Sequence, residues 1–102
     1  MPILNATQAF KSGGSAVGNT VVHITDLFST AELDRAERAW FTCSVQPVNY
    51  CYDGSAPATG AIGGHQLPIG GSSNSDGNYN IRNLKWIRHG ADDGAIFVTL
   101  EE

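Results

Sequence analysis

Charged residues are scarce in this chain, and basic residues are scarcer than acidic ones. Charged side chains make up 16% of the 102 residues, below the ~25% that is typical of soluble domains. Ten acidic residues stand against six basic ones, which gives a formal net charge of −4. Nucleic-acid binding needs a clustered positive field, so this balance argues against nucleic acid as the main partner. The local basic group of Arg82, Lys85 and Arg88 is interpreted as a solvated strand edge.

Long apolar runs and cysteines are also rare. No stretch approaches the ~20 apolar residues that a membrane helix needs, and the start of the chain lacks the basic and apolar segments of a secretory signal. We therefore expect a soluble protein, made in a cytoplasm, with no membrane partner. The two cysteines, Cys43 and Cys51, have no further Cys or His at zinc-like spacing. Two free thiols are expected in that compartment, although their strands could be close enough for a disulfide.

The recognised catalytic motifs are missing as well. The sequence contains no Gly-x-x-x-x-Gly-Lys, no Gly-x-Ser-x-Gly and no His-Glu-x-x-His. Its three histidines are far apart, and the carboxylate pair Asp92-Asp93 lies in a glycine-flanked segment typical of a turn. The polar run from Asn74 to Asn78 is similar to the start of a calcium loop but lacks the closing Glu. We expect no enzyme activity, no metal and no cofactor.

Glycine, in contrast, is abundant, with 12 residues, and Ser, Thr and Asn fill much of the remainder. Such residues accept the dihedral angles of tight turns. Between them, apolar residues recur with the period of two that strands show, most clearly over residues 95–101. Further strands are expected at 18–27, 39–45, 48–52, 65–73 and 79–88, the last of these forming a hairpin with 95–101. The pattern predicts an all-β fold, a small antiparallel β-sandwich or jelly roll.

One short helix and an extended N-terminal arm complete the expected architecture. Residues 29–38 have a narrow apolar stripe, and Ser29 followed by Glu32 fits a capping box. Residues 1–15 are weakly patterned and include the flexible run Lys11-Ser-Gly-Gly-Ser15. We therefore expect an arm over residues 1–15 and a single β domain over residues 16–102.

Candidate interface residues come from apolar side chains that the pattern does not commit to the core. In residues 39–45, Trp40 alternates with the apolar set and is expected on the outward side, where it would cover a second layer or belong to an interface. The arm would be buried by a neighbouring subunit or would fray. The candidates are Ile3, Leu4, Phe10, Trp40, Trp86 and Phe97. For those that lie in a predicted strand, a position in the core is the alternative.

Several short motifs in the last two thirds of the chain occur together in one group of proteins. Tyr50-Cys-Tyr-Asp-Gly54 ends an aromatic strand and is followed by Ser55-Ala-Pro57. The later matches are Gly64-His65, Gly70, Asn80-Ile-Arg-Asn83, Ile87-Arg88, Asp92-Asp93-Gly94 and Val98-Thr-Leu-Glu101. In these features the chain resembles small structural proteins encoded by tailed bacteriophages and prophages, over residues 36–101. It departs from them in a longer segment between Gly70 and Asn80, which is expected to be an exposed loop tip.

The resemblance implies a non-enzymatic virion protein, assembled in the host bacterial cytoplasm. The leading hypothesis is a capsid decoration or cement protein that binds the major capsid protein on the outside of the head, as a homo-oligomer. A neck, tail or fibre-base component is the first alternative. A small cupin-like or carbohydrate-binding module is the second, and its site would be lined by Tyr50, Tyr52 and Tyr79.

Overall fold

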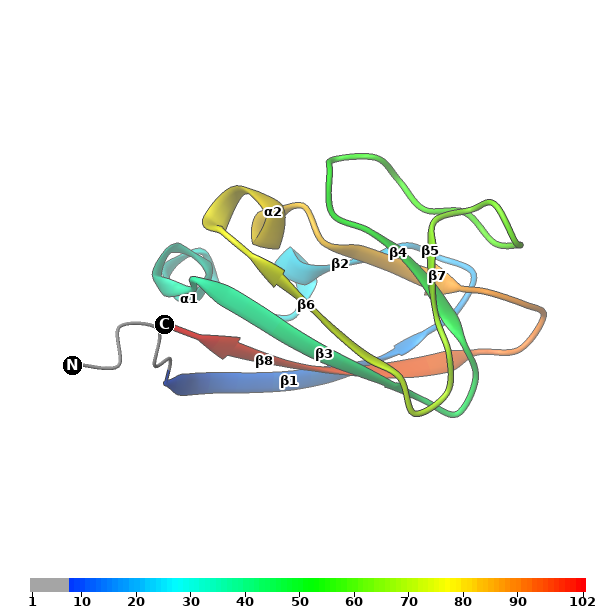
Figure 1. The fold of residues 1–102 in the computed structure, drawn as a ribbon, viewed down its shortest axis with the longest axis horizontal. Helices are drawn as coiled ribbons and strands as arrows, with labels where there is room; N and C mark the ends of the chain where they lie inside the picture. Colours follow the sequence, from blue (N-terminus) through cyan, green and yellow to red (C-terminus); the bar gives the residue numbers. More distant parts are fainter. Residues whose placement is uncertain (1–7) are drawn as a thin grey trace.

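The computed structural model describes residues 8–102, which form a two-layer β-sandwich (Figure 1). One layer, which we call sheet A, has the strand order β1-β8-β3-β6; the other, sheet B, has the order β2-β7-β4-β5. All pairings are antiparallel. The strands of sheet A are β1 (Ala9–Val17), β8 (Gly94–Glu101), β3 (Arg38–Ser44) and β6 (Ser72–Asp76). Those of sheet B are β2 (Val22–His23), β7 (Lys85–Arg88), β4 (Val48–Cys51) and β5 (His65–Leu67). The predicted fold class, a small antiparallel β-sandwich, is confirmed.

The core between the sheets is organised around Phe41 of β3. Its ring meets Trp86 of β7 and Tyr50 of β4 edge to face, with centroids 5.4 and 5.0 Å away. This geometry places the positive edge of one ring on the negative face of another. Alternation explains the burial, because every second residue of β3 and β8 points inward. The fully enclosed side chains also include Val17, Ile24, Leu33, Ala39, Val48, Ile81, Leu84, Val98 and Leu100.

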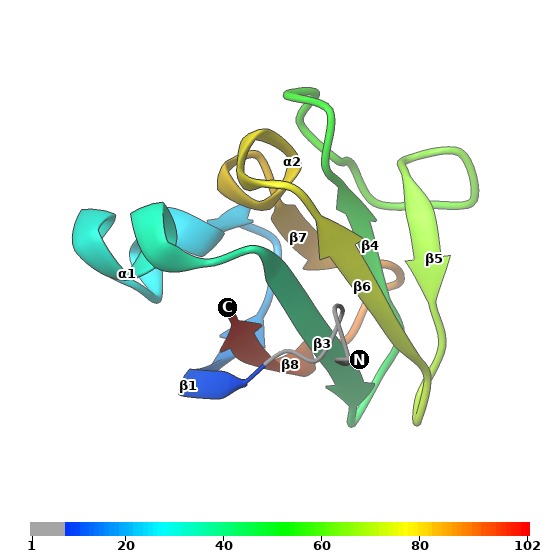
Figure 2. The same cartoon turned by 60° about the vertical axis from the view of Figure 1, so that its left-hand side comes forward.

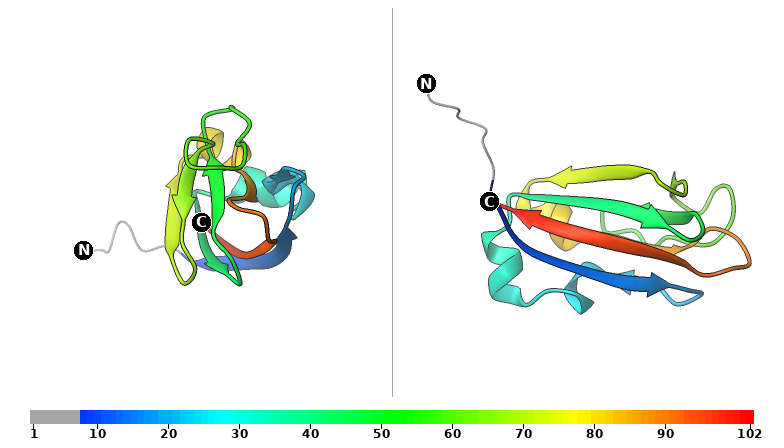
Figure 3. Two further views of the ribbon diagram at one scale, coloured as in Figure 1. Left: turned by 90° about the vertical axis from the view of Figure 1, so that its right-hand side faces the viewer. Right: turned by 90° about the horizontal axis from the view of Figure 1, so that it is seen from below.

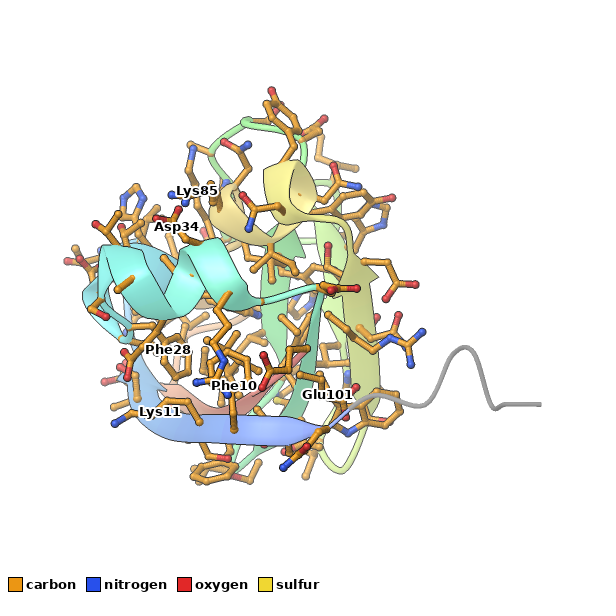
Figure 4. The ribbon with its side chains drawn as sticks, turned by 90° about the vertical axis from the view of Figure 1, so that its left-hand side faces the viewer. Phe10, Lys11, Phe28, Asp34, Lys85 and Glu101 are labelled. Carbon is orange, nitrogen blue, oxygen red and sulfur yellow. The ribbon has the colours of Figure 1, made fainter. Side chains whose placement is uncertain are left out.

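A short helix, α1 (Thr30–Arg35), covers one end of the core. The predicted capping box is confirmed: the Ser29 N–H donates to Glu32 Oε1 at 2.9 Å, and the Glu32 N–H donates to Ser29 Oγ at 3.2 Å. The helix stops before residue 38 because β3 begins there. Figure 4 shows Phe10 and Phe28 between α1 and β1, so the helix closes the sandwich over these two rings.

The strand predicted over 79–88 is wrong in its first half. Residues Asn78–Arg82 form a second helix, α2, and only Lys85–Arg88 is strand. Asn78 explains the difference, because its side-chain amide donates to the carbonyl oxygens of Leu33 (2.7 Å) and Ala36 (3.3 Å) at the end of α1. The exposed loop tip predicted between residues 70 and 80 is also wrong, since β6 and α2 begin in that segment and lie against β3 and α1 (Figure 2).

The predicted hairpin of 79–88 with 95–101 does not exist. β7 pairs with β2 and β4, whereas β8 pairs with β1 and β3, so the segment between them crosses from one sheet to the other. The β3–β4 connection makes a second crossing, with Val45 at φ 73° and a hydrogen bond from the Gln46 N–H to the Ser44 carbonyl at 2.9 Å. Gly94 lies beneath this corner, where a Cβ would come within 2.4 Å of the Gln46 carbonyl oxygen.

Part of the N-terminal region, which its composition predicts to be a flexible arm, forms a strand of sheet A. The boundary expected after residue 15 falls inside β1, which pairs with β8 from Ala9 to Val17. Gly13 of this strand faces the Phe28 ring, which lies 3.6 Å from the position that a Cβ would take, an ordinary contact distance. The strand predicted at 18–27 is reduced to Val22–His23, followed by a 3-10 helix, η1 (Ile24–Asp26). The remainder of the predicted arm, residues 1–7, lies outside the described residues.

Candidate functional site

The outward face of sheet A is open to solvent along all four strands. The right-hand view of Figure 3 looks onto these strands, and no other described segment crosses in front of them. Apart from two aromatic side chains, the middle of this face is made of small residues. They are Ser12, Gly14 and Ala16 of β1, Ala95 and Thr99 of β8, Thr42 and Ser44 of β3, and Ser72 and Asn74 of β6. The result is a flat surface on which large side chains stand out.

Trp40 and Phe97 are those two aromatic residues. Their side chains are 41% and 54% exposed. The register pairs Trp40 with Thr99 and Thr42 with Phe97, so the two are diagonal neighbours on adjacent strands, which places them roughly 7–8 Å apart and within reach of each other. Phe97 also lies over Gly14 on β1, where a Cβ would be 3.1 Å from a ring carbon. Trp40 is on the outward side, as its alternation predicts.

The other predicted interface residues lie elsewhere. Trp86 is completely buried and packs against Phe41, so it is a core residue and offers no surface to a partner. Phe10 is partly buried against the core, with the Arg35 guanidinium 4.1 Å from its ring centroid. Ile3 and Leu4 fall among residues 1–7, outside the described part of the chain. Among the candidates within residues 8–102, the structure therefore brings together only Trp40 and Phe97.

Sheet B presents a different outward face, because the chain's own 52–64 segment covers part of it. Asn49 of β4 is fully buried on this side. Its side-chain amide donates to the carbonyl oxygens of Ala58 and Gly60, both at 2.8 Å, and its Oδ1 lies 2.8 Å from His89 Nδ1. Since the amide nitrogen serves two carbonyls, Oδ1 is the acceptor and His89 Nδ1 carries the proton. Nothing in the sequence pattern distinguishes Asn49 from an ordinary outward-facing polar residue.

Every lysine and arginine lies in the described residues, and each has a partner. Arg82 pairs with Asp34, Arg88 with Asp93 at 3.0 Å, and Lys85 donates to the Gly54 carbonyl at 2.9 Å. The basic group noted in the sequence is thus divided among three separate contacts. The others form ion pairs near α1, namely Lys11 with Glu32, Arg35 with Glu102, and Arg38 with Asp76.

The two cysteines are free thiols. Cys43 is in sheet A and Cys51 in sheet B, so the two strands predicted as neighbours belong to different layers. Burial raises the pKa of the Cys43 thiol; burial and the nearby Asp53 carboxylate raise the pKa of the Cys51 thiol. Both groups are therefore less nucleophilic at neutral pH than an ordinary cysteine.

Two other kinds of site are absent from the described part of the chain. Across residues 8–102, no group of three or more His, Cys, Asp or Glu side chains is placed to hold a metal ion. Among the same residues, no helix has the length and apolar character needed to cross a bilayer.

A small pocket opens where β4 ends and β5 begins, at the edge of sheet B. It has a volume of about 280 Å³ and is lined by Cys51, Tyr52, Asp53, Ile62, Gly64 and His65. Of the three tyrosines predicted to line a site, only Tyr52 does so. Tyr50 packs against the core and its hydroxyl lies 3.0 Å from Ser73 Oγ, while Tyr79 is exposed on α2. Tyr52 is 39% exposed.

Comparison of the chain with family models, with curated proteins and with solved structures found no match.

Proposed function

We propose that this chain is a non-enzymatic structural protein of a tailed-bacteriophage virion, and specifically a capsid decoration protein that binds the outside of the head. The observation that carries the proposal is the pair Trp40 and Phe97 on the open face of sheet A. The phage resemblance of residues 36–101 supplies the class of partner, the major capsid protein.

The open face has the composition of a docking surface. Aromatic side chains contribute most of the binding energy in many protein interfaces, and they act best when neighbouring contacts exclude water around them. Small Ser, Thr, Gly and Ala residues around Trp40 and Phe97 let a partner surface approach closely. Burying the exposed part of both side chains, about half of each, would contribute roughly 1 kcal/mol per ring, half of the value for a fully exposed side chain.

Repetition would make a modest single contact sufficient. A capsid presents many identical sites, and an oligomeric decoration protein binds several of them at once, which raises the overall affinity well above that of one site. Such a role requires neither a catalytic group nor a cofactor. The raised pKa values of both thiols and the individually paired basic residues are in keeping with it.

The experiment is the copy number of this protein in purified virions, measured by quantitative mass spectrometry against the major capsid protein. A decoration protein is expected in hundreds of copies per particle. A neck, tail or fibre-base component, the alternative within the same class, is expected in roughly six to twelve copies, as in a symmetric ring. Absence of the protein from purified virions would overturn both.

A further inference from the structure

The pocket at the edge of sheet B lies on the other layer from Trp40 and Phe97. The left-hand view of Figure 3 shows the 52–64 segment projecting from that layer. The pocket is not used by the docking role proposed above. From its walls we infer that it is a binding site for a single neutral sugar ring.

One wall is an aromatic platform. The Tyr52 and His65 rings are stacked, with centroids 5.5 Å apart and planes 18° apart. Tyr50 lies behind His65 at 5.4 Å and is fixed to β6 through Ser73. The three rings therefore form a row from the core to the pocket, which holds the partly exposed Tyr52 in place. The C–H face of a pyranose is apolar and packs on such a ring. Ile62 also lines the pocket, with its side chain almost fully exposed to solvent.

The pocket lining also supplies hydrogen-bonding groups beside this platform. Asp53 Oδ1 accepts the Ser55 N–H at 3.0 Å, and this contact lowers the pKa of the Asp53 carboxyl, which keeps it ionised. A carboxylate has about four acceptor positions, so Asp53 retains capacity for ligand hydroxyls. The imidazole of His65 provides a ring N–H and a ring nitrogen acceptor. An aromatic platform with hydrogen-bonding groups beside it suits a sugar ring, which has an apolar C–H face and polar hydroxyls.

The pocket is formed before any ligand arrives. Gly64 has φ 152°, and a Cβ there would be 2.9 Å from the Tyr50 carbonyl oxygen, so the segment can only pass this close to β4 as glycine. The turn at Gly54, with φ 96°, is held by Lys85. Asn49 fixes the covering segment at Ala58 and Gly60. Rigid walls lower the entropy cost of binding.

Size and charge restrict the class of ligand. About 280 Å³ is just below the ~300–1,000 Å³ of drug-sized sites, which suits one ring and not an oligomer. Within residues 8–102, the groups around the pocket do not form a metal site. A small organic cation is the competing ligand, because an aromatic ring beside a carboxylate also suits a quaternary ammonium group.

The test is an NMR titration of the full chain, labelled with nitrogen-15, with the methyl glycosides of glucose, galactose, mannose and N-acetylglucosamine. At least one sugar should shift amide signals around Cys51, Asp53, Gly64 and His65, with a dissociation constant in the millimolar range. Tyr52→Ala should remove these shifts, and Asp53→Asn should weaken binding about tenfold or more. Tyr79→Ala, an exposed tyrosine outside the pocket, is the matched control and should bind as the unaltered chain does.

Each outcome is decisive. The spectrum itself reports whether a variant is folded, and Asp53→Asn keeps the shape of the side chain should Tyr52→Ala unfold. The inference is overturned if none of the four sugars shifts these signals, or if Tyr52→Ala and Tyr79→Ala bind equally well. It is also overturned if choline, titrated in parallel, shifts them and no sugar does.

Discussion

The outward faces of the two sheets differ in how far the described chain covers them. On sheet B, Ile87 and Asn49 are register partners on the outward side, yet both are buried, at 7% and 0% exposure. The chain's own 52–64 segment provides the cover, held by the hydrogen bonds of Asn49. On sheet A, Trp40 and Phe97 also point outward, but no described segment covers them.

The difference shows which outward face is covered by the described chain and which is left open. Exposed apolar side chains are normal when scattered singly, whereas larger contiguous apolar patches mark interaction sites. On sheet B, the outward-facing apolar residue Ile87 is buried by the chain itself. Sheet A presents two neighbouring aromatic residues that no described segment covers. This contrast is the reason for proposing a docking role for sheet A.

The largest effect is expected from the buried tryptophan. Trp86→Ala removes a completely enclosed ring that contacts Phe41, and such a change should lower the free energy of unfolding by about 3–5 kcal/mol. Urea unfolding followed by circular dichroism measures it. Trp40→Ala is the matched comparison, since it changes the same residue type on the open face. Equal losses in the two variants would show that Trp40 is a core residue and would remove the contrast between inner and outer faces.

An intermediate effect is expected from the group that holds the cover on sheet B. Asn49→Ala removes the side-chain donor to the Ala58 carbonyl oxygen and one of the two donors to the Gly60 carbonyl oxygen, which also accepts the Gly63 N–H, and a lost buried hydrogen-bonding group costs about 1–3 kcal/mol. Hydrogen exchange should also accelerate at the Gly60 amide, which donates to the His89 carbonyl at 2.9 Å. Unchanged exchange there would mean that Asn49 does not fix the cover.

The smallest effect on folding is expected on the open face. Trp40→Ala and Phe97→Ala each remove a side chain that is about half exposed, so each should lower the free energy of unfolding by only about 1 kcal/mol, half of the value for a fully buried side chain. The same urea experiment measures this. A loss as large as that of Trp86→Ala in either variant would mean that the open face stabilises the fold and is not reserved for a partner.

The sequence predicts the layers of this fold better than its connections. Period-two alternation identifies the inner and outer residues of β3 and β8 correctly, and the Ser29–Glu32 capping box identifies the start of α1. Which strands pair is not visible in that pattern, because alternation describes the two faces of a strand and not its neighbours. The crossing between β7 and β8 therefore looks like a hairpin in sequence.

Single polar residues account for the remaining differences. The segment that forms α2 has the sequence pattern of a strand. Its helical conformation depends on the hydrogen bonds from Asn78 to the end of α1, which join residues about 42–45 positions apart. The burial of Asn49 likewise depends on a loop that begins after its strand. For the site, alternation places Trp40 outward, whereas Trp86 cannot be assigned to the core until the packing of Phe41 is known.

The most direct test of the docking role is the binding of the double variant, Trp40→Ala with Phe97→Ala, to phage heads that lack this protein. The unaltered chain should bind in many copies, as measured by co-sedimentation with the heads. The double variant should remain folded and lose this binding, while Tyr79→Ala, which removes an exposed ring from α2, should keep it. Binding of the folded double variant at the level of the unaltered chain would contradict the role proposed for the open face of sheet A.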